Sequence, residues 1–350
     1  MRWGAAIGSL IGLSLAAWLL ASYGLGAIFG LLGQAGWGLL AIVLFHVVQI
    51  LFSALAWRSV AGPMRPQPGI TEFMALRWIR EGVNNLLPVA QIGGGVISAR
   101  LMCRAGVPLV PAVAGSVGDL TVEVLTQLLF TLAGLGLLVL LVGESGIIGY
   151  LLAGVGVSVA LAGSVVAAGR LGLGGWVERG LMRLSRWFGG SAQDVQGLED
   201  AIRALYRTPS RLAWACFHNS LSWLLGGVEV CLALHLLGAT IGFGEGMVIE
   251  TLGQAVRAAG FAIPGAVGVA EGGYVAIGHL FGLAPELAIA LGLMKRLREV
   301  ALGIPALIAW QVRERRPARE APPLQTPPLQ APPLQTGPSP TEPAQRETAA

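Results

Sequence analysis

Charged residues are scarce in this sequence: Asp, Glu, Lys and Arg together make up only 12% of its 350 residues. Soluble domains carry about twice that share, because their surface faces water. Hydrophobic residues reach 54% before the 51 glycines are counted, whereas soluble domains have about 45–50% with glycine included. A chain with so little charge cannot cover a water-facing surface, and the composition therefore predicts an integral membrane protein.

Cysteine and histidine are also scarce, and neither forms a catalytic or metal-binding pattern. The three cysteines lie apart in apolar stretches, at positions 103, 216 and 231, which argues against a disulfide framework or a zinc site. The four histidines are dispersed, at His46, His218, His235 and His279. They lack the spacing of metal ligands or of a nucleophile with its base. We therefore expect packed interior side chains at these positions, with no metal and no cofactor.

Six apolar segments are long enough to cross a bilayer core about 30 Å thick. Arg2 precedes the first of them, but its apolar run is longer than that of a signal peptide, so we expect an uncleaved anchor. The six predicted spans lie near residues 3–23, 37–57, 112–142, 147–168, 213–237 and 286–312.

Arginine is distributed unevenly among the connections between these spans. It occurs in the N-terminus and in 58–71, 100–111, 169–211 and 313–319, whereas 24–36, 143–146 and 238–245 contain neither Lys nor Arg. The positive-inside rule then predicts that both termini are cytoplasmic. The formal charge of +4 is thus an orientation signal, and we expect no nucleic-acid partner.

Two further apolar stretches do not fit a simple alternation of spans. Residues 72–104 lie between two Arg-containing connections, and residues 246–284 lie between two Arg-free ones. Proline and glycine interrupt both in the middle, where they break helices. We predict two re-entrant helical hairpins that enter from opposite faces; a pair of tilted spans at each place is the alternative. The predicted breaking residues are Pro88, Gly93, Gly94, Pro264, Gly265, Gly268, Gly272 and Gly273.

The predicted fold is therefore an all-α polytopic membrane protein with six spanning helices and two oppositely oriented re-entrant hairpins that form an inverted repeat. Aligning Pro88 with Pro264 places Asp119 opposite Lys295, and inverted repeats with broken helices are common in transporters. The predicted organisation is an anchor helix and loop (1–36), repeat unit one (37–142), a linking span with a cytoplasmic amphipathic segment (143–212), repeat unit two (213–312) and a disordered Pro-rich tail (313–350).

Charged residues inside the apolar stretches carry the functional prediction. Each costs about 2.5–3.5 kcal/mol at a bilayer centre, so we expect them to pair inside the bundle. Arg77, Glu81 and Asn84 share one helix face through their i, i+4, i+7 spacing. The pairs either lock the hairpins in place or line a transport groove. The predicted groove residues are Arg77, Arg80, Glu81, Asn84, Gln91, Arg100, Asp119, Glu123, Arg257, Glu271, Lys295, Arg298 and Glu299.

Three motifs suggest a family: RWIREGVNNLLPVAQIGGGVISARLM (77–102), FAIPGAVGVAEGGY (261–274) and LMKRLRE (293–299). They resemble the flippase-like membrane family that includes the transmembrane part of lysylphosphatidylglycerol synthases. The match is most similar to its hopanoid-biosynthesis-associated branch, the HpnL-type membrane proteins. The resemblance covers about residues 1–316. It implies a bacterial inner-membrane protein that moves polar-headed lipids or hopanoids between leaflets.

This sequence departs from the family pattern at one place. An acidic residue commonly follows the first Gly-Gly pair in the family, and here that residue is Gly95. The departure argues against a mechanism with a symmetric acidic pair and leaves Glu271 as the remaining acidic partner.

Three functions follow as hypotheses. The first is a lipid translocator whose partners are membrane lipids. The second is a non-transporting scaffold that holds lipid-biosynthesis proteins at the membrane, since the Pro-rich tail suits partner binding. The third is an intramembrane enzyme, for which Ser116-Val117-Gly118-Asp119 is only a near match to an aspartyl protease motif. We favour the translocator and expect no enzymatic activity.

Overall fold

The computed structural model describes residues 33–64, 66–87, 93–143, 197–260 and 266–316, together with Gly30 and Gly156. All regular elements in these ranges are α-helices, which confirms the predicted all-α class. The predicted anchor 3–23, the span 147–168 apart from Gly156, the basic segment up to 196 and residues 317–350 of the predicted tail lie outside the described residues. Pro88, Gln91, Pro264 and Gly265 lie outside them as well. Residues 313–315, which were predicted to begin the disordered tail, are the last turn of a helix.

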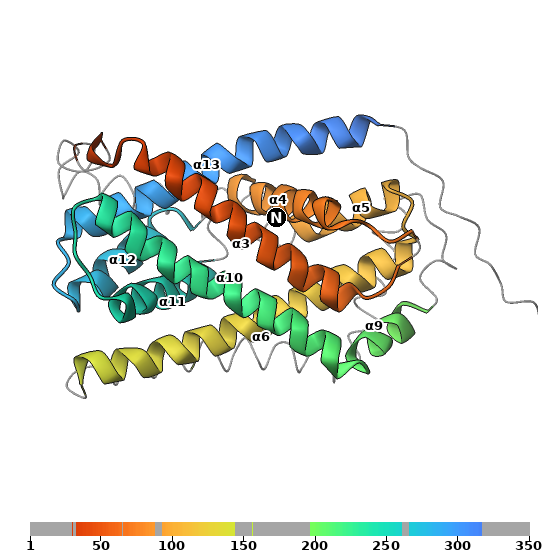
Figure 1. The fold of residues 1–350 in the computed structure, drawn as a ribbon, viewed down its shortest axis with the longest axis horizontal. Helices are drawn as coiled ribbons and strands as arrows, with labels where there is room; N and C mark the ends of the chain where they lie inside the picture. The colour runs from red at the N-terminus through yellow and green to blue at the C-terminus, as the bar shows by residue number, and fades with distance from the viewer. Residues whose placement is uncertain are drawn as a thin grey trace, which may run out of the picture.

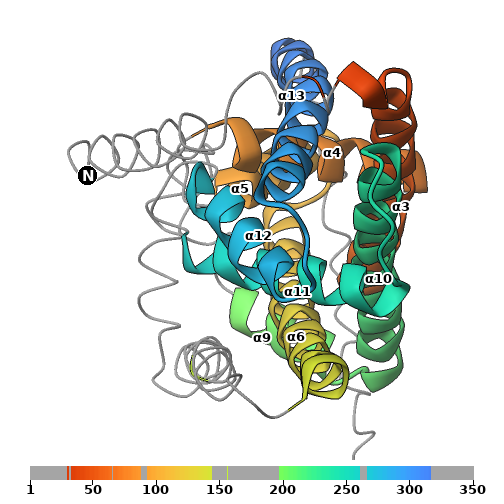
Figure 2. The same ribbon diagram turned by 90° about the vertical axis from the view of Figure 1, so that its left-hand side faces the viewer.

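Three described helices are long and apolar enough to cross a membrane: α3 (Gly38–Ala61), α6 (Leu109–Val142) and α10 (Pro209–Leu236). They match the spans predicted at 37–57, 112–142 and 213–237. At 1.5 Å per residue they are roughly 36–51 Å long. Helices α3 and α10 lie side by side and antiparallel, since Leu236 packs on Gly38 and Arg211 lies at Gly62 (Figures 1 and 2).

Helix α13 (Pro285–Arg315) has the length predicted for the span at 286–312, but a less apolar composition. Its middle carries Lys295, Arg296, Arg298 and Glu299, and α13 is not among the described helices that qualify as spans by hydropathy. The predicted total of six spans therefore stays a prediction.

Short helices occur in two pairs where the hairpins are predicted. Helix α4 (Ile70–Leu86) is followed by α5 (Gly93–Arg104), and α11 (Phe243–Ala259) by α12 (Val269–His279). Leu87, which precedes Pro88, is extended and ends α4, as expected because proline excludes its predecessor from the helical region. In the second interruption Ala266 and Gly268 have positive φ values of 49° and 80°.

Four of the predicted breaking residues lie inside helices and not in the interruptions. Gly93 and Gly94 form the first turn of α5, and Gly272 and Gly273 lie inside α12. Two of these glycines instead permit close helix packing. A Cβ on Gly94 would collide with the Arg80 carbonyl oxygen of α4, and one on Gly273 would lie 2.8 Å from Val256 of α11.

The open ends of the two pairs lie at opposite ends of the bundle (Figure 1). Glu72 at the start of α4 pairs with Arg313, and Arg100 of α5 pairs with Glu314 at 2.7 Å, so both ends of the first pair reach the end of α13. In the second pair, Gly278 near the end of α12 packs on Leu283 just before α13 begins.

Two apolar cores lie around the two helix pairs. The first core surrounds α4 and α5 and includes Trp57, Phe73 and Met102; the second surrounds α11 and α12 and includes Leu138, Leu234 and Ile289. Each long helix contributes to both cores and carries polar residues between them. On α3, for example, Ile42 belongs to the second core and Ala54 to the first, with His46, Gln49 and Ser53 in between. The fold therefore holds a polar layer between two apolar ones.

Helix α9 (Leu198–Tyr206) packs against the beginning of α6. Leu198 is buried with Ala99, Val113 and Ala114 in a third, smaller apolar cluster. The hydroxyl groups of Tyr206 and Thr121 lie 2.8 Å apart. These contacts place α9 at the same end of the bundle as the open end of α4 and α5.

Candidate functional site

Two arginines of α4 bind two carboxylates of α6 in the polar layer. Arg77 donates to Asp119 at 3.2 Å and to Glu123 at 3.1 Å, and Arg80 pairs with both carboxylates as well. The arginines are only 6% and 4% exposed, and Asp119 1%. Charge-assisted bonds of this kind are the strongest available to side chains, and they fix the first helix pair to α6.

The second helix pair is fixed to α13 by ion pairs of similar kind. Arg257 of α11 pairs with Glu299, and Glu250 of α11 pairs with Lys295. Arg296 connects Glu271 and Glu299, at 3.0 Å from each carboxylate. Each short helix pair is thus held to a long helix by interior ion pairs.

The two pairs meet in the middle of the bundle. Arg257 near the end of α11 donates to the side-chain oxygen of Asn85 near the end of α4, at 3.0 Å. The neighbouring Asn84 accepts the backbone N–H of Gly94 at 2.9 Å, which connects α4 to α5 across their interruption. The polar layer is therefore built from the inner ends of both pairs.

His46 and Glu229 belong to this layer, although neither was among the groove residues predicted from the sequence. One ring nitrogen of His46 lies 3.1 Å from Glu229 and the other 3.3 Å from Glu81. Glu229 is fully buried in α10 and also binds Gln49 and Arg298. The available signal was a lone carboxylate in the predicted span 213–237, with His46, Gln49 and Ser53 on one face of another span. The expected packed histidine is instead a bridge between two acids.

These groups form one interior ion network. Among the described residues it has six basic members and, with Glu229, seven acidic ones. The basic members are Arg77, Arg80, Arg257, Lys295, Arg296 and Arg298; the acidic ones are Glu81, Asp119, Glu123, Glu229, Glu250, Glu271 and Glu299.

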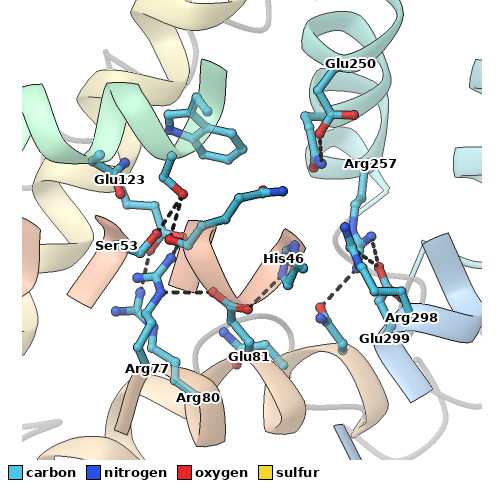
Figure 3. A pocket seen from close by; sticks show the side chains of 17 residues that line it. His46, Ser53, Arg77, Arg80, Glu81, Glu123, Glu250, Arg257, Arg298 and Glu299 are labelled. Atoms are coloured by element: carbon cyan, nitrogen blue, oxygen red, sulfur yellow. Dashed lines mark hydrogen bonds and ion pairs between the residues drawn. The ribbon is translucent and has the colours of Figure 1, made fainter. Parts of the chain in front are cut away.

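A polar cavity of about 190 Å³ opens within the network. Figure 3 shows Arg77 and Arg80 on one side of it, Arg257, Arg298 and Glu299 on the other, and His46 and Glu81 between them. Glu123 and Glu250 also line it, and the remaining lining residues are neutral and polar: Gln49, Ser53, Asn84, Asn85, Asn219, Ser222, Trp223 and Gln254. The cavity can therefore offer donors and acceptors to a polar group of either charge.

The predicted groove residues divide into those that line this cavity and those that support it. The lining residues are Arg77, Arg80, Glu81, Asn84, Glu123, Arg257, Arg298 and Glu299. Asp119 and Lys295 lie outside the lining, as partners of Arg77 and Arg80 and of Glu250. Arg100 lies at the end of the bundle with Glu314.

Glu271 also lies outside the cavity lining, and its contacts are those of a helix cap. Its carboxylate accepts the backbone N–H of Gly268 at 2.7 Å and pairs with Arg296. A carboxylate at a helix start satisfies an unpaired backbone donor and favours the helix dipole. Glu271 therefore fixes the start of α12.

One donor in the lining has no partner among the described residues. The Nε of Arg298 is buried without a hydrogen bond, although the same guanidinium binds Glu229. A buried unpaired donor costs about 1–3 kcal/mol, so the hydrogen bonds of the Arg298 guanidinium are incomplete in this arrangement. Within the described part of the chain, no cluster of His, Cys, Asp or Glu suits a metal ion.

Comparison with known proteins gives one family. The model of the lysylphosphatidylglycerol synthase TM region matches residues 5–306. No curated protein and no solved structure matches the chain.

Proposed function

Because the chain belongs to the family of the lysylphosphatidylglycerol synthase transmembrane region, we propose that it is a lipid translocator of a bacterial inner membrane. The family makes it a membrane protein with a lipid-related role. The proposed step is movement of a polar-headed lipid or a hopanoid between leaflets, without enzymatic turnover. The resemblance of its motifs to the hopanoid-associated branch makes a hopanoid the first lipid to test.

The observation that carries this proposal is the position of the polar cavity. It lies between two apolar cores, in the middle of helices that are long enough to cross a bilayer. The barrier to lipid flipping is the transfer of a polar headgroup through hydrocarbon, where unsatisfied polar groups cost several kcal/mol. A cavity with both charges and neutral donors at that depth lowers the barrier.

The orientation proposed for the bundle follows from its arginines. The end at which α4 begins and α5 ends carries Arg100, Arg104, Arg313 and Arg315, and we assign it to the cytoplasm by the positive-inside rule. In this orientation α4–α5 and α11–α12 are re-entrant hairpins that enter from opposite faces and form the inverted repeat. Helix α4 is roughly 26 Å long and α5 roughly 18 Å, both short of a bilayer core.

The proposed path keeps the hydrocarbon tails in the bilayer. Large apolar side chains on α3 and α6, among them Leu44, Leu129 and Leu140, are 60%, 60% and 82% exposed and suit contact with lipid tails. The headgroup would enter the cavity, where its oxygens could accept from Arg298 and neighbouring donors. As the headgroup passes, charged side chains of the network would release their protein partners in turn and bind the headgroup.

A reconstituted flipping assay tests the proposal. The full chain is placed in liposomes with tail-labelled phosphatidylglycerol or a tail-labelled amino-hopanoid, and transfer between leaflets is followed by quenching. Arg298→Gln, which alters the cavity, should slow flipping about tenfold or more, the factor for ~1.4 kcal/mol of barrier. Arg313→Gln is the matched control on the same helix, because Arg313 pairs with Glu72 away from the cavity.

Two results decide against the translocator. One is a wild-type rate equal to that of empty liposomes with every lipid tested. The other is equal rates for wild type and Arg298→Gln when both variants elute as folded protein. Arg257→Gln provides a second cavity variant from another helix.

A further inference from the structure

His46 has a carboxylate at both of its ring nitrogens. Nδ1 lies 3.1 Å from Glu229 on α10 and Nε2 lies 3.3 Å from Glu81 on α4. A neutral imidazole has one donor and one acceptor, whereas an imidazolium has two donors. In a neutral ring, the nitrogen without a hydrogen would face a carboxylate oxygen with its lone pair, and two acceptors repel each other. The geometry thus favours the protonated ring.

The surroundings of the two acids favour their ionised forms. Glu229 accepts from the amide nitrogen of Gln49 at 2.5 Å and pairs with Arg298, whose guanidinium can only donate. Glu81 accepts from Nε of Arg77 at 3.2 Å through its other oxygen. A proton on Glu229 would leave the buried Arg298 opposite a neutral acid, and one on Glu81 would weaken its pair with Arg77. The ring of His46 is therefore the best place for the shared proton.

The charge balance of the interior ion network gives an independent reason. Its six basic and seven acidic members leave one net negative charge if His46 is neutral, and none if His46 is protonated. A net charge in the low-dielectric interior of a membrane protein is costly. One proton on His46 balances the network.

Other charged groups surround the ring of His46 without bonding to it. Arg298 of α13 opposes a positive ring, but its own guanidinium is bound to Glu229. Glu299 of α13 borders the small space shared by His46 and Glu81. Across the cavity lie Glu123 of α6 and Glu250 and Arg257 of α11. Within the part of the chain that the structure describes, both hydrogen-bond partners of the ring are carboxylates.

We propose that His46 is a proton-binding site whose proton controls access to the polar cavity. The protonated ring joins α3 to α4 and α10 through Glu81 and Glu229. Loss of the proton removes the donor to Glu81 and leaves the network with one unbalanced negative charge, so that Glu81 becomes available to groups in the cavity. His46, Glu81 and the headgroup path share this cavity, and the link to transport rests on the proposed function. Flipping should therefore speed up as pH rises through the titration of His46.

The protonation state is measured on the full chain in lipid nanodiscs. Nitrogen-15 NMR of labelled histidine rings separates doubly from singly protonated imidazole, and His46→Gln assigns the signal among the four histidines. At about pH 7.5 we expect one doubly protonated ring that disappears in His46→Gln, since an exposed histidine is mostly neutral there. A neutral His46 ring at this pH overturns the proposal.

Glu81→Gln tests the cause of protonation and covers the case that His46→Gln does not fold. An amide can donate to a ring nitrogen, so a neutral ring satisfies both neighbours in this variant. The His46 signal should become singly protonated at the same pH. If the His46 signal stays doubly protonated in this variant, the Glu81 carboxylate is not what keeps the proton on His46, contrary to the proposal.

The flipping assay then tests the link to transport. Between about pH 6 and about pH 8.5 the wild-type rate should rise by more than about tenfold, because the deprotonated fraction of a ring that is still protonated at about pH 7.5 rises by more than that factor. His46→Gln should lose this dependence, and His279→Gln, a change at an exposed position, should keep it. Equal pH profiles in wild type and His46→Gln overturn the proposal. A doubly protonated ring in a protein that flips no lipid supports the proton site and contradicts the proposed function instead.

Discussion

Arg257 of α11 donates a hydrogen bond to Asn85 of α4 across 3.0 Å, although 172 residues separate them in the chain. Arg257 also pairs with Glu299 of α13. This contact joins the inner ends of the two short helix pairs at the edge of the polar cavity. A passing headgroup would have to separate or replace it.

The contact between these two residues should matter more for transport than for stability. Asn85→Ala removes one hydrogen bond, which contributes about 0.5–1.5 kcal/mol, while Arg257 keeps its pair with Glu299. We expect a small fall in melting temperature and a several-fold change in flipping rate. Ser59→Ala is the control, because among the described residues the Ser59 side chain bonds only to the Leu55 carbonyl oxygen of its own helix. Equal flipping rates in the two variants would contradict the prediction.

Gly94 and Gly95 form a matched pair for testing close packing between α4 and α5. A Cβ at Gly94 would collide with the Arg80 carbonyl oxygen and with Asn84, whereas one at Gly95 would have no atom of the described residues within 4 Å. Gly94→Ala should destabilise the protein by about 1–3 kcal/mol through overpacking. Gly95→Ala should be neutral or stabilising by up to about 1 kcal/mol, because alanine favours helix. Thermal unfolding in detergent measures both, and equal midpoints would contradict the packing.

Glu271 and Glu299 should differ in their effect on transport. Glu271 caps α12 outside the cavity lining, whereas Glu299 lines the cavity and binds Arg257. Glu271→Gln keeps an oxygen for the Gly268 N–H but loses the charge that pairs with Arg296 and favours the helix dipole. It should lower stability by about 0.3–1 kcal/mol and keep the flipping rate of the folded fraction. Glu299→Gln should slow flipping. Loss of flipping in folded Glu271→Gln, with Glu299→Gln active, would reverse these roles.

Cysteine labelling should place the open ends of the two helix pairs on opposite sides of the membrane. Thr71 and Ala284 are exposed at those ends. With the three native cysteines replaced, Ala284→Cys should react with an impermeant maleimide on intact spheroplasts. Thr71→Cys should react only after permeabilisation, since its end carries the arginines assigned to the cytoplasm. Reaction of both from one side would refute the opposed hairpins.

Much of the fold was accessible from the sequence because the relevant signals are local. The spans at α3, α6 and α10 were predicted from runs of apolar residues, and the interruption after Leu87 from the proline that follows it. These signals depend on each residue's own transfer free energy or backbone freedom. Contacts between distant parts of the chain are not needed to read them.

The sequence by itself determined that this is a helical membrane protein with charges inside its apolar segments. Only the tertiary structure decided how those charges pair. His46 lies 183 residues from Glu229 along the chain, and no periodicity connects positions on separate helices. Whether an acid lines a cavity, as Glu299 does, or caps a helix, as Glu271 does, depends on how helices from both halves of the chain pack together. Packing sets the distances between side chains, and electrostatic pairing in a low-dielectric interior depends on those distances.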